Sequence, residues 1–255
     1  MMKRNRVMSG ALFAFALLAG PMAHADDEKP VSLIVPPKAG RVTRAKTIIK
    51  SNLNGADLLI TQTRKDTVKA VKENGDFIVE ITDEGTTINF GGTDQEGPAM
   101  PPQTITRDKV NKIKEMKTPD ANPYMAPEVS QLMVELATAI LTDKPVKAKD
   151  TWQTELDNPA VKEKKITVKD TYLGPEKIDG KDYWKIKQTA EAIVDTDGSK
   201  MTYEITQWID PADGSIFKID GTLKDIPTTS GPLTMQITST AIKAADKSKA
   251  ETAKP

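Results

Sequence analysis

Short runs in which hydrophobic and polar residues alternate occupy most of the chain beyond residue 41. An alternation with a period of two places successive side chains on opposite faces of a strand, one toward the core and the other toward water. Turn-forming pairs such as Asn74-Gly75 and Asp179-Gly180 separate several of these runs. The pattern predicts strands at 57–63, 67–72, 76–82, 86–90, 151–156, 165–169, 183–188, through 192–194, and at 201–209, 215–223 and 233–239.

The segments between these runs are less regular. Residues 91–103 are rich in glycine, proline and acid and are predicted to form a loop, and a turn is predicted at Glu84-Gly85. Residues 108–116 fit either a short helix or a strand. Three prolines between 117 and 127 exclude a long regular element there, because proline lacks the backbone donor that helices and strands use.

One stretch has a helical period instead. Pro127 suits a first helical turn, and Glu128 complements the positive end of the helix dipole. Apolar residues then recur at helical spacing and predict a helical insert at about 126–142 with one apolar stripe: Val129, Leu132, Met133, Leu136, Ile140 and Leu141. The stripe either covers a sheet or lines and closes an apolar ligand cavity.

The pattern as a whole predicts an α+β, mainly β, protein. Its antiparallel sheet is strongly curved or folded over, in two stretches that the helical insert separates. The folded domain is expected to span 41–243. Residues 26–40 mix charge with proline and are predicted to form an extended lead-in, and 244–255 are predicted to form a disordered tail because they contain little to bury.

The N-terminal residues have the three parts of a secretion signal. Lys3, Arg4 and Arg6 give a basic start, residues 11–18 are apolar, and the small-residue pattern before Asp26 predicts cleavage between Ala25 and Asp26. The apolar run is shorter than the ~20 residues that a membrane-spanning helix needs, so no transmembrane anchor is expected after cleavage. We expect a periplasmic or secreted protein.

Loss of this signal changes the chemistry that remains. His24 is the single histidine of the 255 residues and the sequence has no cysteine, so the rest of the chain offers neither imidazole nor thiolate to a metal or a nucleophilic mechanism. The chain has 36 basic and 36 acidic residues; the signal contains three basic residues and no acid, which leaves 33 against 36. No strong positive field is predicted to attract nucleic acid.

The remaining motifs do not fit a catalytic or metal site. The run from Asp195 to Gly198 has its glycine at the fourth position, where a calcium loop has it at the sixth, and therefore predicts a hairpin turn. Gly91-Gly92 and Gly97 lack the spacing and the lysine of a phosphate loop. Glycoside hydrolysis needs a pair of carboxylates, but in a chain with 36 acidic residues some pairs lie close together by chance and do not indicate such a site. We expect no enzymatic activity and no catalytic, cofactor-binding or metal-binding residues.

Two segments resemble known exported proteins. Residues 144–152 are similar to a P-V-x-x-G-D-T-W phrase of uncharacterised exported bacterial proteins, with Ala148-Lys149 where a glycine is expected. Residues 207–218 resemble the W-x-D-P-x-x-G-x-x-x-K hairpin of the periplasmic lipoprotein-carrier (LolA-like) superfamily, which includes the mycobacterial lipid-carrier lipoproteins. The resemblance implies an open, strongly curved antiparallel sheet, or half-barrel, whose concave apolar face is plugged by helix.

Two functions follow as hypotheses. The first is an exported, non-enzymatic binding protein whose central helix covers an apolar cavity for a lipid or other apolar small molecule. The alternative is a structural or protein-interaction module with a filled core, which contacts an envelope protein through strand edges or the acidic loop 94–102. The three tryptophans of the second half either belong to the core or sheet edge, or line a pocket. The candidate lining residues are Val129, Leu132, Met133, Leu136, Ile140, Trp152, Trp184 and Trp208.

Overall fold

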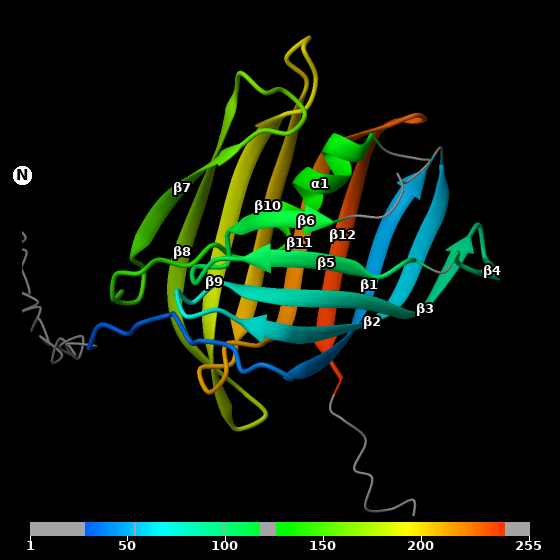
Figure 1. Cartoon of the computed structure of the whole chain (residues 1–255). Coiled ribbons are helices and arrows are strands. Elements are labelled where there is room, and N and C mark those ends of the chain that lie inside the picture. Colours follow the sequence, from blue (N-terminus) through cyan, green and yellow to red (C-terminus); the bar gives the residue numbers. More distant parts are fainter. Residues whose placement is uncertain (1–28, 54, 99, 118–125, 243–255) are drawn as a thin grey trace, which may run out of the picture.

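The computed structural model describes residues 29–53, 55–98, 100–117 and 126–242. The predicted signal at 1–25 and the predicted tail at 244–255 lie outside the described residues. The elements follow one another along the chain as shown in Figure 1: β1 (Val42–Leu53), β2 (Ala56–Val71), β3 (Phe77–Phe90), β4 (Thr93–Glu96), β5 (Gln103–Arg107), β6 (Ile113–Lys117), α1 (Pro127–Leu136), β7 (Thr151–Asp157), β8 (Lys165–Ile178), β9 (Lys181–Ile193), β10 (Lys200–Ile209), β11 (Ile216–Thr228) and β12 (Gly231–Ala241).

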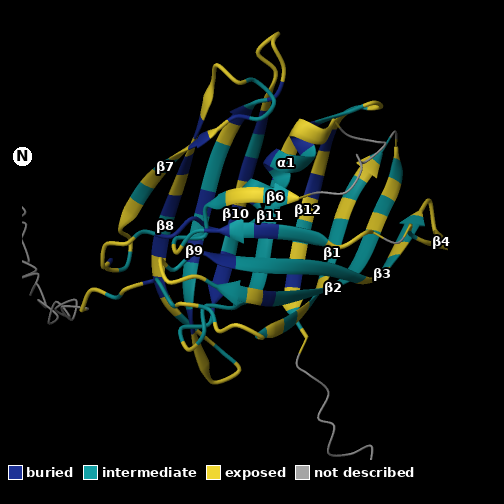
Figure 2. Cartoon of the chain, in the orientation of Figure 1, coloured by how far each residue is buried: buried dark blue, intermediate teal, exposed yellow. Residues whose placement is uncertain are grey.

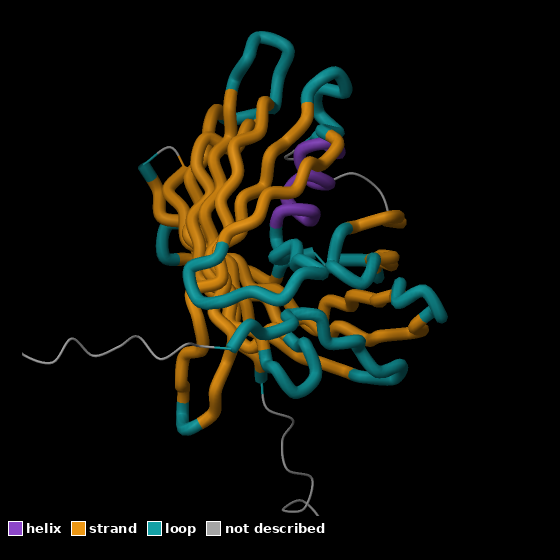
Figure 3. The backbone as a smooth tube through the Cα atoms, turned by 90° about the vertical axis from the view of Figure 1, so that its left-hand side faces the viewer, coloured by secondary structure: helices purple, strands orange, loops and turns teal. Residues whose placement is uncertain are grey.

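These strands form one antiparallel sheet in the order β6-β5-β3-β2-β1-β12-β11-β10-β9-β8-β7, with β4 paired to β3. The first and last strands of the chain, β1 and β12, pair with Ala45 opposite Ala241 and so join the two meanders. The sheet does not close, because β6 and β7 remain its two ends. Figure 3 shows the sheet bent, with α1 on its inner side. The structure confirms the predicted mainly β fold, an open curved antiparallel sheet with one covering helix.

Several strands are longer than the sequence pattern predicts, among them β2, β3 and β8. The predicted strands 57–63 and 67–72 are parts of the single strand β2, which continues through Arg64 and Asp66. The predicted turn at Glu84-Gly85 is wrong, because β3 also continues through it. Thr63 pairs with Gly85 and Arg64 pairs with Asp83, which leaves Glu84 as an extra residue in a β-bulge. A bulge bends the strand without ending it.

The irregular stretch between β3 and α1 contains more strand than predicted. Within the predicted loop 91–103, β4 pairs with β3. The undecided segment 108–116 divides into a turn and β6. The turn is held by the carboxylate of Asp108, whose Oδ1 accepts hydrogen bonds from the backbone N–H groups of Val110 at 3.0 Å and Lys112 at 2.9 Å. Such an Asx-type turn reverses the chain and starts the next strand.

Helix α1 ends at Leu136, earlier than the predicted 142. Beyond it, main-chain groups find partners elsewhere in the fold. The carbonyl of Ile140 accepts a hydrogen bond from the indole Nε1 of Trp152 at 2.7 Å, and the N–H of Leu141 donates to the carbonyl of Val110 at 2.8 Å. Because tertiary contacts satisfy these groups, the segment does not need helical hydrogen bonds.

The hydrophobic core is uneven across the sheet. One buried cluster lies between α1 and the strands β7 to β12, and a second is formed around Leu33, Tyr172 and Ile209. The lead-in contributes Leu33, which is fully buried, and Val31, which bridges to Val146. Figure 2 shows burial concentrated over the second half of the sheet. The inner face of β1, β2 and β3 is packed less completely.

No helix in the part of the chain that the structure describes is long and apolar enough to cross a membrane.

Candidate ligand-binding cavity

A cavity of about 370 Å³ lies where the inner face of the sheet is least filled. Alternate residues of each strand point toward it, because the side chains of a strand alternate between faces. Apart from the exposed Arg44, the lining residues of the first three strands follow this period of two: Thr43, Ala45, Thr47 and Ile49 on β1, Gln62, Arg64, Asp66 and Val68 on β2, and Phe77, Val79, Ile81 and Asp83 on β3.

Much of the cavity wall is apolar. β11 and β12 contribute Ile219, Leu223 and Ile237, which complete the sheet side of the wall. Helix α1 borders the opposite side with Met133 and Val134. Such a wall favours an apolar ligand, because removing its surface from water gains about 25 cal/mol per Å².

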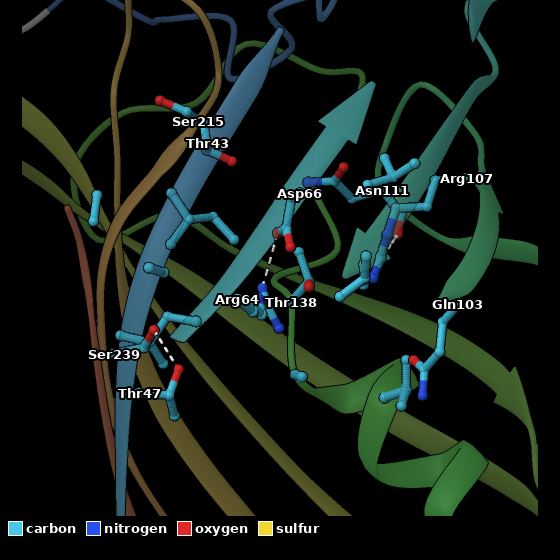
Figure 4. Close-up of a pocket in the computed structure, with 18 of the residues that line it drawn as sticks. Thr43, Thr47, Arg64, Asp66, Gln103, Arg107, Asn111, Thr138, Ser215 and Ser239 are labelled. Atoms are coloured by element: carbon cyan, nitrogen blue, oxygen red, sulfur yellow. Dashed lines mark hydrogen bonds and ion pairs between the residues drawn. The ribbon is translucent and has the colours of Figure 1, made fainter. Parts of the chain in front are cut away.

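The wall also contains a charged pair on β2. Arg64 and Asp66 are two residues apart and share the inward face, where the guanidinium Nη2 lies 3.1 Å from Oδ2 of Asp66. Figure 4 shows both side chains directed into the cavity. The Nε of Arg64 and the Oδ1 of Asp66 are buried without a hydrogen-bond partner in the structure. Buried polar groups normally have hydrogen-bond partners, so the described residues leave this charged pair incompletely satisfied.

Arg107, at the end of β5, is the most buried cation of the cavity. Its side chain donates one hydrogen bond, from Nη1 to the main-chain carbonyl of Asn111 at 2.7 Å. Burial, reinforced by the nearby charge of Arg64, lowers the pKa of Arg107 to about 10. The guanidinium still carries its charge at neutral pH, and its environment disfavours that charge.

Arg41 extends the cationic wall from the start of the first meander. Its Nη1 donates a hydrogen bond to the main-chain carbonyl of Asp213. Burial lowers the pKa of Arg41, while the carboxylates of Asp213 and Asp66 oppose that shift.

The predicted lining residues of the helix occupy two different environments. Met133 borders the cavity. The structure places Val129, Leu132, Leu136 and Ile140 in the packed core instead, with relative exposures of 3% or less. The stripe is the face with which α1 covers the sheet, so only the flank of the helix reaches the cavity.

The three tryptophans lie away from the cavity lining. Trp152 and Trp184 pack against the second buried cluster, around Leu33 and Tyr172. Trp208 follows the inward-facing Gln207 on β10, and its ring lies 5.1 Å from the Nζ of Lys185 and 4.6 Å from that of Lys218. The structure thus places them in core and sheet positions.

Sequence reasoning missed the charged lining residues Arg64, Asp66 and Arg107. The available signal is the alternation itself. If β2 is continued through its charged centre, Gln62, Arg64, Asp66 and Val68 fall on one face. Residues 64–66 are charged and interrupt the hydrophobic pattern, which therefore predicts two strands instead of one.

A second polar group lies on β8, β9 and β10, where Tyr203 also borders the cavity. Asp170 on β8 is opposite Gln188 on β9, and both side chains are fully buried with unpartnered polar atoms. Tyr203 and Gln207 flank the same position on β10, and the hydroxyl of Tyr203 is also unpartnered. Burial raises the pKa of Asp170 to about 8, and burial together with the charge of Asp170 raises that of Tyr203.

Among the described residues, no three or more histidine, cysteine, aspartate or glutamate side chains are grouped so that they could hold a metal ion.

Neither a protein-family model nor a curated protein matches the sequence. Among solved structures, the chain is similar to lipovitellin, in a structure that concerns lipid–protein interactions, with a TM-score of 0.44 and 11% identity over 80% of this chain. The chain spans 25% of the length of that lipovitellin chain.

Two bacterial structures are similar over more of their own length. One is a protein named as a lipoprotein from Parabacteroides distasonis, with a TM-score of 0.31 and 11% identity over 84% of this chain and 98% of that chain. The other is a domain named as an outer membrane lipoprotein-sorting protein from Vibrio parahaemolyticus, with a TM-score of 0.22 and 9% identity over 81% and 85%. These similarities are weak, and none of them identifies a ligand for this chain.

Proposed function

We propose that the chain is an exported, non-enzymatic binding protein of the cell envelope that carries a lipid or other apolar ligand in its cavity. The observation that supports this most is the cavity itself. At about 370 Å³ it falls within the roughly 300–1,000 Å³ typical of small-molecule sites, and it is bordered by sheet on one side and helix on the other.

The energetics favour a ligand with an alkyl chain. Each buried methylene contributes about 0.8 kcal/mol. Ile49, Ile219 and Ile237 come from three adjacent strands, and Met133 faces the cavity from α1. A chain of several methylenes that contacts both surfaces would gain several kcal/mol.

Two parts of this proposal rest on the sequence. Export is proposed from the N-terminal pattern, and the non-enzymatic role is proposed from the composition. The basic start, short apolar run and small residues before Asp26 are typical of a cleaved signal. Without His24, the chain has no histidine or cysteine to act as a general base or nucleophile.

The experiment is to purify the protein without detergent and weigh it by native mass spectrometry. We expect a population heavier than the bare chain, whose extra mass is recovered as lipid on solvent extraction. The extracted protein should then bind 11-(dansylamino)undecanoate saturably at one site.

A bare mass together with no saturable dansyl signal would reject the carrier function. It would favour the alternative of a protein-interaction module with no small ligand.

A further inference from the structure

Positive charge is concentrated on the cavity wall although the chain as a whole is close to neutral. The ionisable lining residues are the cations Arg41, Arg44, Arg64, Arg107 and Lys109 and the anions Asp66 and Asp83. Arg44 is paired with Glu84 at 2.8 Å. Arg44 is exposed and lies opposite Lys65, so it faces away from the cavity; the other four cations against two anions still leave an excess of positive charge on a wall that is otherwise largely apolar.

Arg107 is a buried cation of this wall that no direct ion pair balances among the described residues. The carboxylates that act on its charge are Asp66, Glu135 and Asp108. Among the described residues, none forms an ion pair with it, and its one hydrogen bond goes to a neutral carbonyl. A buried charge without a partner is costly, so such a guanidinium is expected to have a partner in the working protein.

Arg64 lies close enough to Arg107 for the two charges to repel each other. Asp66 neutralises one of the two arginines through a single contact to Arg64. Among the described residues the buried Nε of Arg64 has no hydrogen-bond partner, so the surrounding protein does not fully satisfy this guanidinium. Of the described carboxylates near these two guanidinium groups, only Asp66 contacts one of them, so both groups keep N–H donors for a further anion.

We propose that the cavity selects amphiphiles that have an alkyl chain and an anionic headgroup, carboxylate or phosphate, and that Arg64 and Arg107 bind the headgroup. This inference rests on the proposed carrier function and names the class of its ligand. The arginines hold the anion by charge-assisted hydrogen bonds, and the apolar wall covers the chain. A neutral or cationic amphiphile leaves both arginines uncompensated.

The test compares headgroups on one chain length by calorimetric titration at pH 8 in low salt, with each amphiphile below its micelle concentration. The probes are dodecanoate, dodecyl phosphate, dodecanol and dodecyltrimethylammonium, with acetate and inorganic phosphate as headgroups without a chain. We expect the two anionic amphiphiles to bind at least about tenfold more tightly than dodecanol, which corresponds to about 1.4 kcal/mol. Acetate and phosphate should bind far more weakly than either.

Variants then locate the headgroup. Arg107→Gln and Arg64→Gln should each weaken the binding of the anionic amphiphiles much more than the binding of dodecanol and so remove most of the preference for an anionic headgroup. Lys65→Gln is the matched control: it removes the same charge from the same strand at a position between the two inward-facing residues, on the opposite face of β2. Lys65→Gln should leave the affinity for the anionic amphiphiles and the affinity for dodecanol unchanged.

Equal binding of dodecanol and dodecanoate by the wild-type protein would overturn the headgroup proposal and leave the carrier function intact. Acetate or phosphate binding as tightly as the amphiphiles would overturn it too, in favour of a small-anion site. If both arginine variants lose the same affinity for every ligand, the arginines only shape the cavity and do not bind the headgroup. If no amphiphile binds, the carrier function itself is rejected. The wild-type series decides the proposal even if a variant does not fold.

Discussion

The buried side chain of Asp170 makes the stability of this protein depend on pH. Its carboxyl group is fully buried opposite Gln188, and burial raises its pKa from 3.8 to about 8. Between these values the folded protein holds a proton that the unfolded chain has lost. The free energy of unfolding therefore decreases as the pH rises through this window, by at most about 1.4 kcal/mol per pH unit from this residue.

We predict that Asp170→Asn removes this pH dependence, because asparagine is neutral throughout and has nearly the same shape. Urea denaturation at pH 5, 6.5 and 8 measures the free energy of unfolding. The difference between the variant and the wild-type protein should shift in favour of the variant at each higher pH. Asp143→Asn, at an exposed position, is the control and should follow the wild-type curve. The free energy of unfolding is plotted against pH for the wild-type protein, Asp143→Asn and Asp170→Asn. If all three curves run parallel, Asp170 is ionised in the folded state and this assignment is wrong.

The inward position of Asp170 could have been predicted from the sequence. Ile166, Val168, Asp170 and Tyr172 alternate, so a strand continued past residue 169 places the carboxylate on the core face. Its lack of a partner could not have been predicted, because that depends on which residue of β9 lies opposite. A charged residue on a buried face ended the predicted strand both here and at Arg64, since charge normally marks the edge of a buried run.

At the scale of elements, α1 divides its residues between two tasks. Leu136 is fully buried in the core beneath the helix, whereas Met133 borders the cavity. The helical period predicted the element and its apolar stripe from sequence. It could not separate core from cavity, because both environments select apolar side chains and the choice depends on where the sheet curves away.

We predict opposite effects of two alanine substitutions in this helix. Leu136→Ala should lower the free energy of unfolding by about 2–5 kcal/mol, since it leaves a cavity in close-packed core, and should leave ligand affinity nearly unchanged. Compared with Leu136→Ala, Met133→Ala should lower the free energy of unfolding less and change the affinity for an acyl probe more. Thermal melts and probe titrations of both variants measure the two quantities.

A result in which Leu136→Ala costs no stability would mean that the stripe is not packed on the sheet. A result in which Met133→Ala leaves the affinity for the probe unchanged would mean that the ligand does not reach the helix.

At the scale of the whole molecule, one sheet both packs against the helix and borders the cavity. The strands from β7 to β12 pack against α1, whereas the inner face of β1, β2 and β3 borders the cavity. Local alternation and turns predicted most strands of the two meanders, but not β1, which precedes the first predicted strand at 57. The union of the two meanders was not predictable, because the pairing of β1 with β12 joins residues nearly 200 positions apart, such as Ala45 and Ala241. That pairing brings the cavity walls together.

The central claim is that a ligand occupies this cavity, and a substitution that fills the cavity tests it most directly. Ala45 lines the cavity on β1, between Arg64 on β2 and Ala241 on β12. Ala45→Trp places an indole in the space that the ligand would take. The adjacent Lys46 is exposed, so Lys46→Trp is a control of equal bulk.

The measurement is the dissociation constant of 11-(dansylamino)undecanoate for the wild-type protein and both variants, each first shown to be folded by circular dichroism. The account predicts saturable binding at one site for the wild-type protein and Lys46→Trp, and at least about tenfold weaker binding for Ala45→Trp. Binding by Ala45→Trp as tight as that of the wild-type protein would contradict the account, because the ligand would then occupy some other part of the molecule.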